Sequence, residues 1–426
     1  MATSPLTNLY AARPDTAASR PAVAGDMTAD VCIVGAGFTG LGAALTLAQA
    51  GADVRVIEAA RVGGGASGVN GGQVHPGQRR DQAWLEARLG EARARALWDI
   101  AEEARHWLHE VTDAHAIDCD FRPGLLAIAH RPRHFRALAQ DAEHLTRLYG
   151  VTGLEVLAGA ELEKYTHMRG AYGGVLNPNG GHVDPLALTR GLARAAEHAG
   201  ARVHENSPVL RVVPDAGAWR VATDAGSVRA RSVLMTGDGS LGALSTIVAA
   251  HVMPLVNFMV ATAPLDAELA RSVLSAPIAA SDTRYVVNYF RRTGDDRIVF
   301  GGGESYGNDV PADFASRVSR RMLGLFPQLS ASPVTHGWGG RLGITATRLP
   351  FVRMPQAGLY VASGFSGQGV MLGPYTGRIV AQAILGDDER FQHLAALPVP
   401  PLPGGRLLRR PLLTAAMIGF GLLDRF

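Results

Sequence analysis

A glycine-rich hexamer near the start of the chain has the residue types and spacing of a nucleotide-binding turn. The sequence GAGFTG, residues 35–40, follows a β-branched run from Asp30 to Val34 and precedes a helical pattern through Ala50. This spacing lets a strand turn sharply into a helix, so that backbone amides and the positive end of the helix face a pyrophosphate. The predicted pyrophosphate-binding residues are Gly35, Gly37, Phe38, Thr39 and Gly40.

A carboxylate ends the second strand of the same unit, which is predicted from Asp53 to Ala59. At this position Glu58 can accept hydrogen bonds from ribose hydroxyls and repel a 2′-phosphate, and Ala59 extends the predicted contact. Two more small residues have the positions that this unit requires: Ala44 lies where the helix packs on the sheet, and Gly51 lies at the end of the helix. A tight turn without a ligand does not explain this agreement. We therefore predict a dinucleotide site in a βαβ unit.

The residues after Glu58 favour FAD over NAD. They form a long glycine-rich loop, residues 61–73, in which glycine lets the backbone approach the ribityl chain and isoalloxazine of FAD closely. An ordinary mobile connection is the alternative interpretation of this loop. The predicted FAD contacts within it are Gly65, Ala66, Ser67, Asn70, Gly71, Gly72 and Gln73.

A second glycine cluster, at residues 362–374, repeats the pattern of a strand that ends in glycines and enters a helix. Its amides can face the electron-rich N1 and O2 edge of a reduced flavin. Alone, this cluster could be an ordinary helix-start turn, but two separated backbone cradles suit one extended cofactor. The predicted contacts here are Gly364, Ser366, Gly367, Gln368, Gly369 and Val370.

The composition bounds the class of protein. The chain has 426 residues, 47% of them hydrophobic and 19% charged, which predicts two packed domains. The formal net charge is only +3 and the arginines are scattered, which disfavours a nucleic-acid partner. Cys32 and Cys119 are its only cysteines and cannot build a disulfide framework or a zinc site. We therefore predict no metal and a cytoplasmic location.

Both ends of the chain carry distinctive segments. Residues 1–28 are rich in Ala, Pro, Ser and Thr and lack the apolar centre of a secretory signal, which predicts a solvent-exposed arm. No segment reaches the roughly 18 to 20 apolar residues that a membrane span needs. The uncharged run from Pro411 to Leu423 predicts a packed terminal helix, with interfacial membrane contact as the alternative.

The intervening sequence predicts the elements that position the glycine turns. Apolar periodicity and composition indicate helices over Trp84–Val111, Arg133–Tyr149 and Pro185–His198. Alternating and β-branched patterns indicate strands over Phe121–Ala129 and Tyr285–Arg291, among others.

These motifs together resemble the FAD-dependent D-amino acid oxidase and sarcosine oxidase superfamily, and within it most closely the γ-glutamylputrescine oxidoreductases. The resemblance covers nearly the whole chain. The segments that carry it are GASG at 65–68, NGGQ at 70–73, IDCDFRPG at 117–124, GGHVDP at 180–185, GGG at 301–303, the cluster at 364–369, LP at 397–398 and PGGR at 403–406. The neighbourhoods of Cys119 and Gly405 are the most specific to the subgroup.

The resemblance implies an α/β fold with a discontinuous, Rossmann-like FAD-binding domain of the glutathione-reductase type and an α+β substrate domain on a mixed or antiparallel sheet. The implied division is an N-terminal arm at 1–28, a FAD domain at 29–84, 183–245 and 338–390, a substrate domain at 85–182 and 246–337, and a C-terminal extension at 391–426. The implied reaction oxidises a carbon–nitrogen bond of a small amine or amino acid to an imine by hydride transfer to flavin N5. The electron acceptor is O2 or another oxidant. Val209 and Gly237 complete the implied FAD contacts.

Some residues depart from the family pattern. Val69 stands where close relatives often carry arginine, and Gly237-Asp238-Gly239 replaces an Ala-Gly-Asn type of turn. The sarcosine oxidases attach FAD through a cysteine in the C-terminal half and use a lysine in oxygen activation. Here both cysteines lie in the N-terminal third and Lys164 is the only lysine, so we predict noncovalent FAD and leave oxidase and dehydrogenase open.

Five residues are candidates for substrate binding or catalysis. Asn70 and Gln73 lie in the loop that should run beside the isoalloxazine. His182 could act as a base and Arg341 could pair with a substrate carboxylate, while Tyr289 could wall an amine pocket. The alternatives are a structural role for the histidine and core packing for the tyrosine.

Several functions compete at this stage. The leading substrate is a γ-glutamylated diamine, and the alternative is a cyclic or secondary amino acid such as L-pipecolate. A tRNA-modifying flavoprotein is a remote alternative that requires a contiguous basic surface. An NAD-linked dehydrogenase is disfavoured by the second glycine cradle, and nothing in the sequence favours a noncatalytic binding protein.

Overall fold

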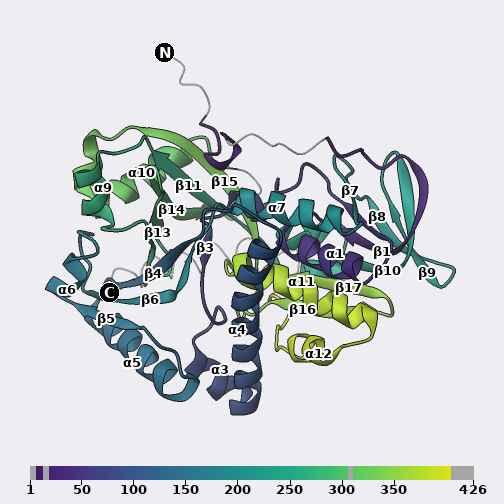
Figure 1. The fold of residues 1–426 in the computed structure, drawn as a ribbon, viewed down its shortest axis with the longest axis horizontal. Coiled ribbons are helices and arrows are strands. Elements are labelled where there is room, and N and C mark those ends of the chain that lie inside the picture. Colours follow the sequence, from purple (N-terminus) through teal and green to yellow (C-terminus); the bar gives the residue numbers. More distant parts are fainter. Residues whose placement is uncertain (1–5, 13–18, 306–309, 404–426) are drawn as a thin grey trace.

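The computed structural model describes residues 6–12, 19–305 and 310–403 (Figure 1). Two β-sheets organise these residues, one of eight strands and one of nine. Helices α1, α4 and α11 lie between and beside the sheets in the central part of the view (Figure 1).

The eight-stranded sheet has the order β16-β17-β10-β1-β2-β7, and β8 and β9 extend it through β10. Its central pairs β17/β10, β10/β1, β1/β2 and β2/β7 are parallel, as expected for strands joined by helical crossovers. The bounds are β1 Gly25–Val34, β2 Val54–Ile57, β7 Arg202–His204, β8 Arg211–Asp215, β9 Ala218–Ala222, β10 Gly226–Met235, β16 Phe351–Gln356 and β17 Leu359–Ser363.

The helices that accompany this sheet are α1 Phe38–Gln49, α4 Glu91–Ala114, α7 Pro185–His198, α11 Gly369–Leu385 and α12 Glu389–Ala395. Their apolar faces and the sheet form one large core. The start of α7 shows how the local sequence sets a boundary. Asp184 accepts hydrogen bonds from the amides of Leu186 and Ala187, and Pro185 occupies the first turn, where its missing N–H costs nothing.

The nine-stranded sheet has the order β15-β11-β14-β13-β12-β4-β6-β3, with β5 paired to β6. All its pairs are antiparallel except the parallel pair β12/β4. The bounds are β3 Gln73–Val74, β4 Arg122–Ala129, β5 Glu155–Ala158, β6 Gly173–His182, β11 Met253–Thr262, β12 Ala279–Asp282, β13 Tyr289–Arg292, β14 Ile298–Ser305 and β15 Val334–Ile344. A second core lies between this sheet and the helices on it.

The remaining helices are α2 Ala66–Val69, α3 Gln82–Leu89, α5 Pro132–Tyr149, α6 Ala160–Glu163, α8 Thr246–His251, α9 Ala267–Val273 and α10 Phe314–Leu325. Three 3₁₀ segments are η1 Tyr10–Ala12, η2 Asp238–Ala243 and η3 Pro327–Ala331. Gly90, with φ +85°, separates α3 from α4, so the single helix predicted over Trp84–Val111 is two helices in the structure. Left-handed backbone at this position favours glycine and interrupts the helix.

The predicted fold class, a Rossmann-like domain with a second domain on a mixed sheet, is confirmed. The chain alternates between the two sheets, so each is assembled from separated segments. β15 belongs to the nine-stranded sheet, and the predicted boundary at residue 338 therefore falls inside a strand. α4 lies in the predicted substrate segment 85–182, but its buried residues pack in the core of the eight-stranded sheet.

The prediction of a solvent-exposed arm over residues 1–28 needs correction. Tyr10 is 3% exposed and Val23 is 1% exposed, and β1 begins at Gly25. Arg20 is also buried and forms ion pairs with Glu197 and Glu205. The small and polar residues of this segment give no local signal for these buried contacts, because the contacts form only with residues distant in the sequence.

Within the described ranges, no helix is long and apolar enough to cross a membrane. The predicted terminal helix over Pro411–Leu423 lies outside the described residues.

Candidate functional site

The first glycine turn joins β1 to α1, and its glycines are required by close backbone contacts. A Cβ atom at Gly40 would lie 2.0 Å from the carbonyl oxygen of Gly35, and one at Gly37 would lie 2.8 Å from Oγ of Ser67. Gly35 itself has φ +111°, a conformation that L side chains rarely adopt. The sequence therefore folds locally into a strand-to-helix turn whose backbone carries no side chains at these glycines.

The second glycine cluster reaches the first because α1 and α11 cross at very short range. A Cβ at Gly377 would lie 1.9 Å from the carbonyl oxygen of Thr39, and one at Gly42 would lie 2.1 Å from that of Pro374. Figure 1 shows the two helices side by side. Glycine on each helix permits this approach, which brings the N-termini of α1 and α11 to one cavity.

Asp238 fastens the second turn in place. Its carboxylate accepts hydrogen bonds from the amides of Gly343, at 2.5 Å, and Gly364, at 2.7 Å. It thus connects η2, β15 and the turn between β17 and α11. Burial raises the pKa of Asp238, and the backbone amides around it oppose that shift.

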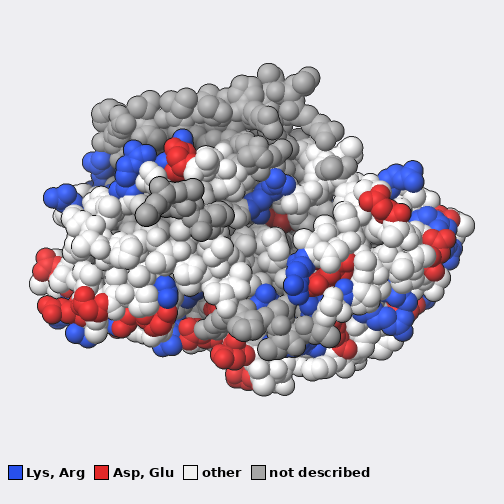
Figure 2. Space-filling view, turned by 90° about the horizontal axis from the view of Figure 1, so that it is seen from above, with Lys and Arg blue, Asp and Glu red and all other residues white. Residues whose placement is uncertain are grey.

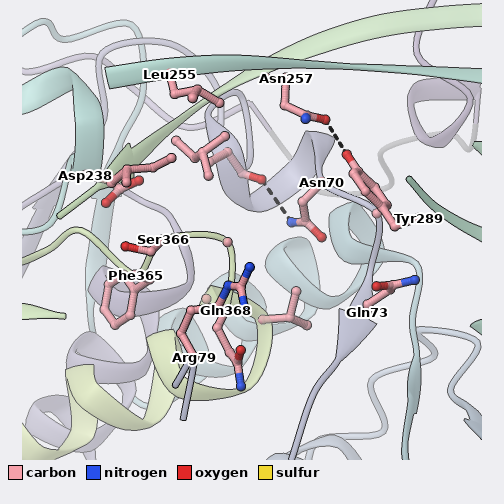
Figure 3. Close-up of a pocket in the computed structure, with 18 of the residues that line it drawn as sticks. Asn70, Gln73, Arg79, Asp238, Leu255, Asn257, Tyr289, Phe365, Ser366 and Gln368 are labelled. Atoms are coloured by element: carbon pink, nitrogen blue, oxygen red, sulfur yellow. Dashed lines mark hydrogen bonds between the residues drawn. The ribbon is translucent and has the colours of Figure 1, made fainter. Parts of the chain in front are cut away.

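The two turns and the nine-stranded sheet enclose a cavity of about 340 Å³, within the range of roughly 300 to 1,000 Å³ typical of ligand pockets. Figure 3 shows around it side chains of the nine-stranded sheet, such as Leu255, Asn257 and Tyr289, and side chains of the turn that follows β17, such as Phe365 and Ser366. The predicted residues that line it are Gly37, Phe38, Thr39, Ala66, Ser67, Asn70, Gly71, Gln73, Tyr289, Ser366, Gly367, Gln368, Gly369 and Val370. The two glycine clusters therefore face the same space, as one extended cofactor requires.

The other predicted cofactor residues are not among those that line this cavity: Gly35, Gly40, Glu58, Ala59, Gly65, Gly72, Val209, Gly237 and Gly364. Among them, Glu58 stands at the end of β2, where its carboxylate accepts hydrogen bonds from the amides of Ala36, at 2.8 Å, and Ala60, at 3.0 Å. The carboxylate thus lies directly beside the first glycine turn.

Tyr289 forms one wall of the cavity. Its ring lies between two glycines, because a Cβ at Gly71 would approach the ring to 2.7 Å and one at Gly301 to 2.0 Å. The hydroxyl donates a 2.5 Å hydrogen bond to Oδ1 of Asn257, as drawn in Figure 3. Burial raises the pKa of Tyr289, so it remains a neutral donor. Asn257 was not predicted from the sequence.

Asn70 and Gln73 line the cavity, but much of their hydrogen-bonding capacity is used within the protein. Nδ2 of Asn70 donates to the carbonyl oxygens of Ala66 and Ser67, both at 2.9 Å, and Oδ1 accepts from the amide of Gly72. Nε2 of Gln73 donates to the carbonyl oxygen of Ala280 at 2.8 Å. These contacts hold the loop between α2 and β3 in shape.

His182 and Arg341 lie outside the set of cavity-lining residues. His182 is fully buried, with Nδ1 accepting from the Arg291 guanidinium and Nε2 donating to the carbonyl oxygen of Pro277, both at 3.0 Å. Burial, followed by the charge of Arg291, lowers the pKa of His182 to about 3. Arg341 is exposed on β15, where its neighbours Gly340 and Leu342 line the cavity instead. Period-two alternation along the strand explains this reversal.

Sequence reasoning missed six charged or titratable residues of the cavity: His75, Arg79, Asp282, Tyr285, Glu304 and Arg348. Burial, followed by the charge of Arg79, lowers the pKa of His75 to about 4, so this histidine is neutral near pH 7. The only local signal was the polar segment HPGQRR at residues 75–80, directly after the glycine-rich loop. Arg348 comes from a loop more than 260 residues later, and no local pattern marks it.

The site fits FAD in its shape and in its donors. Neither Gly37, at the N-terminus of α1, nor Gln368, at that of α11, caps its helix with a side chain. Both helix ends therefore present amides and positive dipole potential to the cavity. Neither cysteine lines the cavity. Within the described ranges, no cluster of three or more His, Cys, Asp or Glu side chains could hold a metal ion.

A glycine-turn Rossmann domain that faces a mixed sheet across one cavity fits the class of FAD-dependent oxidoreductases. The chain belongs to the FAD dependent oxidoreductase (DAO) family, whose model matches residues 30–383. It is 37% identical over 406 residues to a probable oxidoreductase, OrdL, of Rhizobium meliloti, covering 95% of this chain and 94% of that protein. It is 36% identical over 420 residues to the γ-glutamylputrescine oxidoreductase of Escherichia coli, covering 98% of each.

Solved structures support the fold. Glycine oxidase from Geobacillus kaustophilus superposes with a TM-score of 0.69 at 23% identity, covering 84% of this chain and 95% of that chain. L-proline dehydrogenase from P. horikoshii superposes with a TM-score of 0.71 at 19% identity, covering 85% and 94%.

Proposed function

We propose that this protein oxidises a γ-glutamylputrescine-type amine to an imine, with FAD as the hydride acceptor, in polyamine catabolism in the cytoplasm. The family establishes an FAD-dependent oxidoreductase. The choice of amine is supported by 36% identity over nearly the full length to an enzyme of that name.

The single observation that carries the reaction class is the shared cavity. The helix ends at Gly37 and Gln368 open into the same space as the Tyr289–Asn257 wall. The backbone amides at the two turns would hold FAD, which when bound would supply the redox chemistry as acceptor of a hydride equivalent. The residues of this chain bind and orient the amine, and the cavity walls restrict water.

Tyr289 and Asn257 are suited to orient the amine. With its hydroxyl proton donated to Oδ1 of Asn257, the Tyr289 oxygen keeps lone pairs that can accept from an amine N–H. With His182 outside the cavity lining, the proposed role of the protein is positioning, and the amine reacts as the free base.

The test is anaerobic reduction of the purified holoenzyme. Addition of γ-glutamylputrescine should bleach the flavin absorbance, whereas L-pipecolate should leave it unchanged. Bleaching by pipecolate alone would support the cyclic amino acid alternative, and bleaching by neither would reject both substrates. Admission of O2 to the reduced enzyme then separates an oxidase, which recovers its colour rapidly, from a dehydrogenase.

The charge distribution gives no support to the tRNA-modifying alternative. On the face shown in Figure 2, basic and acidic side chains lie interspersed, separated by large uncharged areas. A nucleic-acid-binding face concentrates basic residues along the path of the phosphates. We therefore retain a small-molecule amine as the proposed substrate.

A further inference from the structure

Two arginines enter the cavity from segments far apart in the sequence. Arg79 lies between β3 and α3, and Arg348 lies between β15 and β16. Figure 3 shows Arg79 among the labelled residues around the cavity. The amine-oxidising reaction described above assigns no role to either guanidinium.

A hydrogen bond from a side chain to the backbone holds the two segments next to each other. Nε of Arg80 donates a 2.9 Å hydrogen bond to the carbonyl oxygen of Thr347, which joins the residues that immediately adjoin Arg79 and Arg348. The loop bearing Arg348 is also ordered, because Oγ1 of Thr345 donates to the carbonyl oxygen of Leu349 at 2.7 Å. Arg348 adopts φ +65°, a conformation that a non-glycine residue keeps only where its surroundings require it.

The two like charges interact within the protein. Burial, followed by the charges of Arg348 and Arg80, lowers the pKa of Arg79 to about 10, while Glu304 opposes this shift. Arg79 still remains a cation near pH 7, so protein folding brings positive charges together at the cavity. An anion bound between the two guanidinium groups would offset their repulsion. Glu304 lines the same cavity, which favours a small carboxylate over a polyanion.

We propose that Arg79 and Arg348 form a carboxylate-binding subsite, so that the substrate is an amine whose end opposite the reacting nitrogen carries a carboxylate. Two planar guanidinium groups supply the paired donors that a carboxylate accepts. The amine end then lies toward Tyr289 and Asn257. This inference rests on the proposed amine oxidation and adds the substrate feature that determines specificity. In γ-glutamylputrescine, the amino-acid head would occupy the subsite.

Steady-state kinetics of the holoenzyme test the subsite. Arg79→Met and Arg348→Met should each raise KM for γ-glutamylputrescine by about 10-fold or more, with a smaller change in kcat. The same variants should lower kcat/KM for γ-glutamylputrescine far more than kcat/KM for putrescine, which lacks the carboxylate. Arg88→Met, which removes an exposed arginine of α3 outside the cavity, is the matched control for the change in net charge.

A binding titration keeps the subsite separate from the identity of the substrate. L-glutamate carries the carboxylate head without the reacting amine, and it should perturb the flavin spectrum of the wild type and of Arg88→Met. The two cavity variants should lose this response. If the wild type responds to glutamate but does not oxidise γ-glutamylputrescine, the subsite stands and the proposed substrate fails.

Two results would overturn the subsite. One is that Arg79→Met and Arg348→Met bind glutamate as tightly as the wild type. The other is that they lose FAD while the remaining holoenzyme keeps its KM, which would assign the arginines to the cofactor. Should Arg79→Met fail to fold, Arg79→Lys keeps the charge without the planar fork. A several-fold rise in its KM supports the subsite, and an unchanged KM rejects it.

Discussion

The two glycine turns perform the same task, a strand-to-helix turn that presents amides to the cofactor, but they are stabilised differently. The first is crowded by its own backbone, because a Cβ at Gly40 would contact the oxygen of Gly35. The second depends on a side chain from another part of the chain, because the Asp238 carboxylate accepts the amide of Gly364. The first turn is therefore local, and the second is a tertiary construction.

A turn that is stabilised by its own backbone restricts which residue types it can contain. A turn that is stabilised by a distant side chain depends also on the identity of that side chain. Asp238 provides such a side chain and belongs to the departure Gly237-Asp238-Gly239 noted in the sequence. Substitutions at Gly40, Asp238 and Ser67 test this comparison, and a pH experiment on His182 probes the nine-stranded sheet; they follow in order of decreasing expected effect.

The largest effect should come from Gly40→Ala. The new Cβ would lie 2.0 Å from a backbone oxygen, so the first turn cannot close without moving β1 or α1. We expect nearly complete loss of bound flavin, measured as the ratio of flavin to protein absorbance after purification. Gly324→Ala in α10, where a Cβ meets nothing within 4 Å, should retain normal flavin. Normal flavin in Gly40→Ala would contradict the view that the first turn is rigid.

Asp238→Ala should weaken the second turn while leaving the first intact. It removes the acceptor of two charge-assisted hydrogen bonds, which we expect to weaken FAD binding by roughly 2 to 3 kcal/mol. Asp238→Asn keeps an acceptor oxygen and tolerates the left-handed backbone at φ +46°, so it should lie between Ala and the wild type. The measurement is FAD affinity by titration of the apoprotein, and equal affinities for all three would refute the tether.

Lowering the pH should reduce the stability of the folded protein through His182, which ends β6 in the nine-stranded sheet. Its pKa is lowered to about 3 in the folded protein, so below its ordinary value of 6.5 the unfolded chain binds a proton that the folded chain does not. Stability should therefore fall as the pH decreases from 6.5, by about 2 kcal/mol at pH 5 from this residue alone. Thermal unfolding between pH 7.5 and 5 measures it. His182→Gln should show a shallower dependence, and an unchanged slope would exclude His182 as its source.

Ser67→Ala should give the smallest effect. It removes the 2.9 Å hydrogen bond from the amide of Phe38 to Oγ of Ser67, a contact in the first turn of α1. We expect a loss of about 1 kcal/mol in FAD affinity, less than for Asp238→Ala, because the backbone of the first turn holds its shape without this contact. A larger loss than for Asp238→Ala would reverse the comparison. Apoprotein titration under the same conditions provides the measurement.

Much of the fold could be predicted because its signals are local. The helix over Pro185–His198 matches α7 at both ends, since Asp184 and Pro185 mark its start in the sequence itself. The strand predicted over Tyr285–Arg291 is confirmed only from Tyr289, because residues 283–288 form a connection beside Asp282 rather than a strand. The exposed arm over residues 1–28 was wrong because the partners of Tyr10 and Arg20 are distant in sequence.

The site divides in the same way. The glycines that line the cavity were predictable, since a bare backbone requires glycine in the sequence. Which side chains point into the cavity was not predictable. Arg341 points away from the cavity on β15, while Arg79 and Arg348 enter it from irregular segments. Val69 packs against Gly340, and its carbonyl oxygen accepts from Nε1 of Trp338.

By itself, the sequence determined the two strand-to-helix turns, the acidic residue at the end of β2 and the FAD-dependent class, because steric limits on the backbone act over a few neighbouring residues. Only the tertiary structure decided that both turns open into one cavity and which charges enter it. That outcome depends on the close crossing of α1 and α11 and on strand register in the second sheet. Such contacts join residues hundreds of positions apart, and packing of the whole chain selects them.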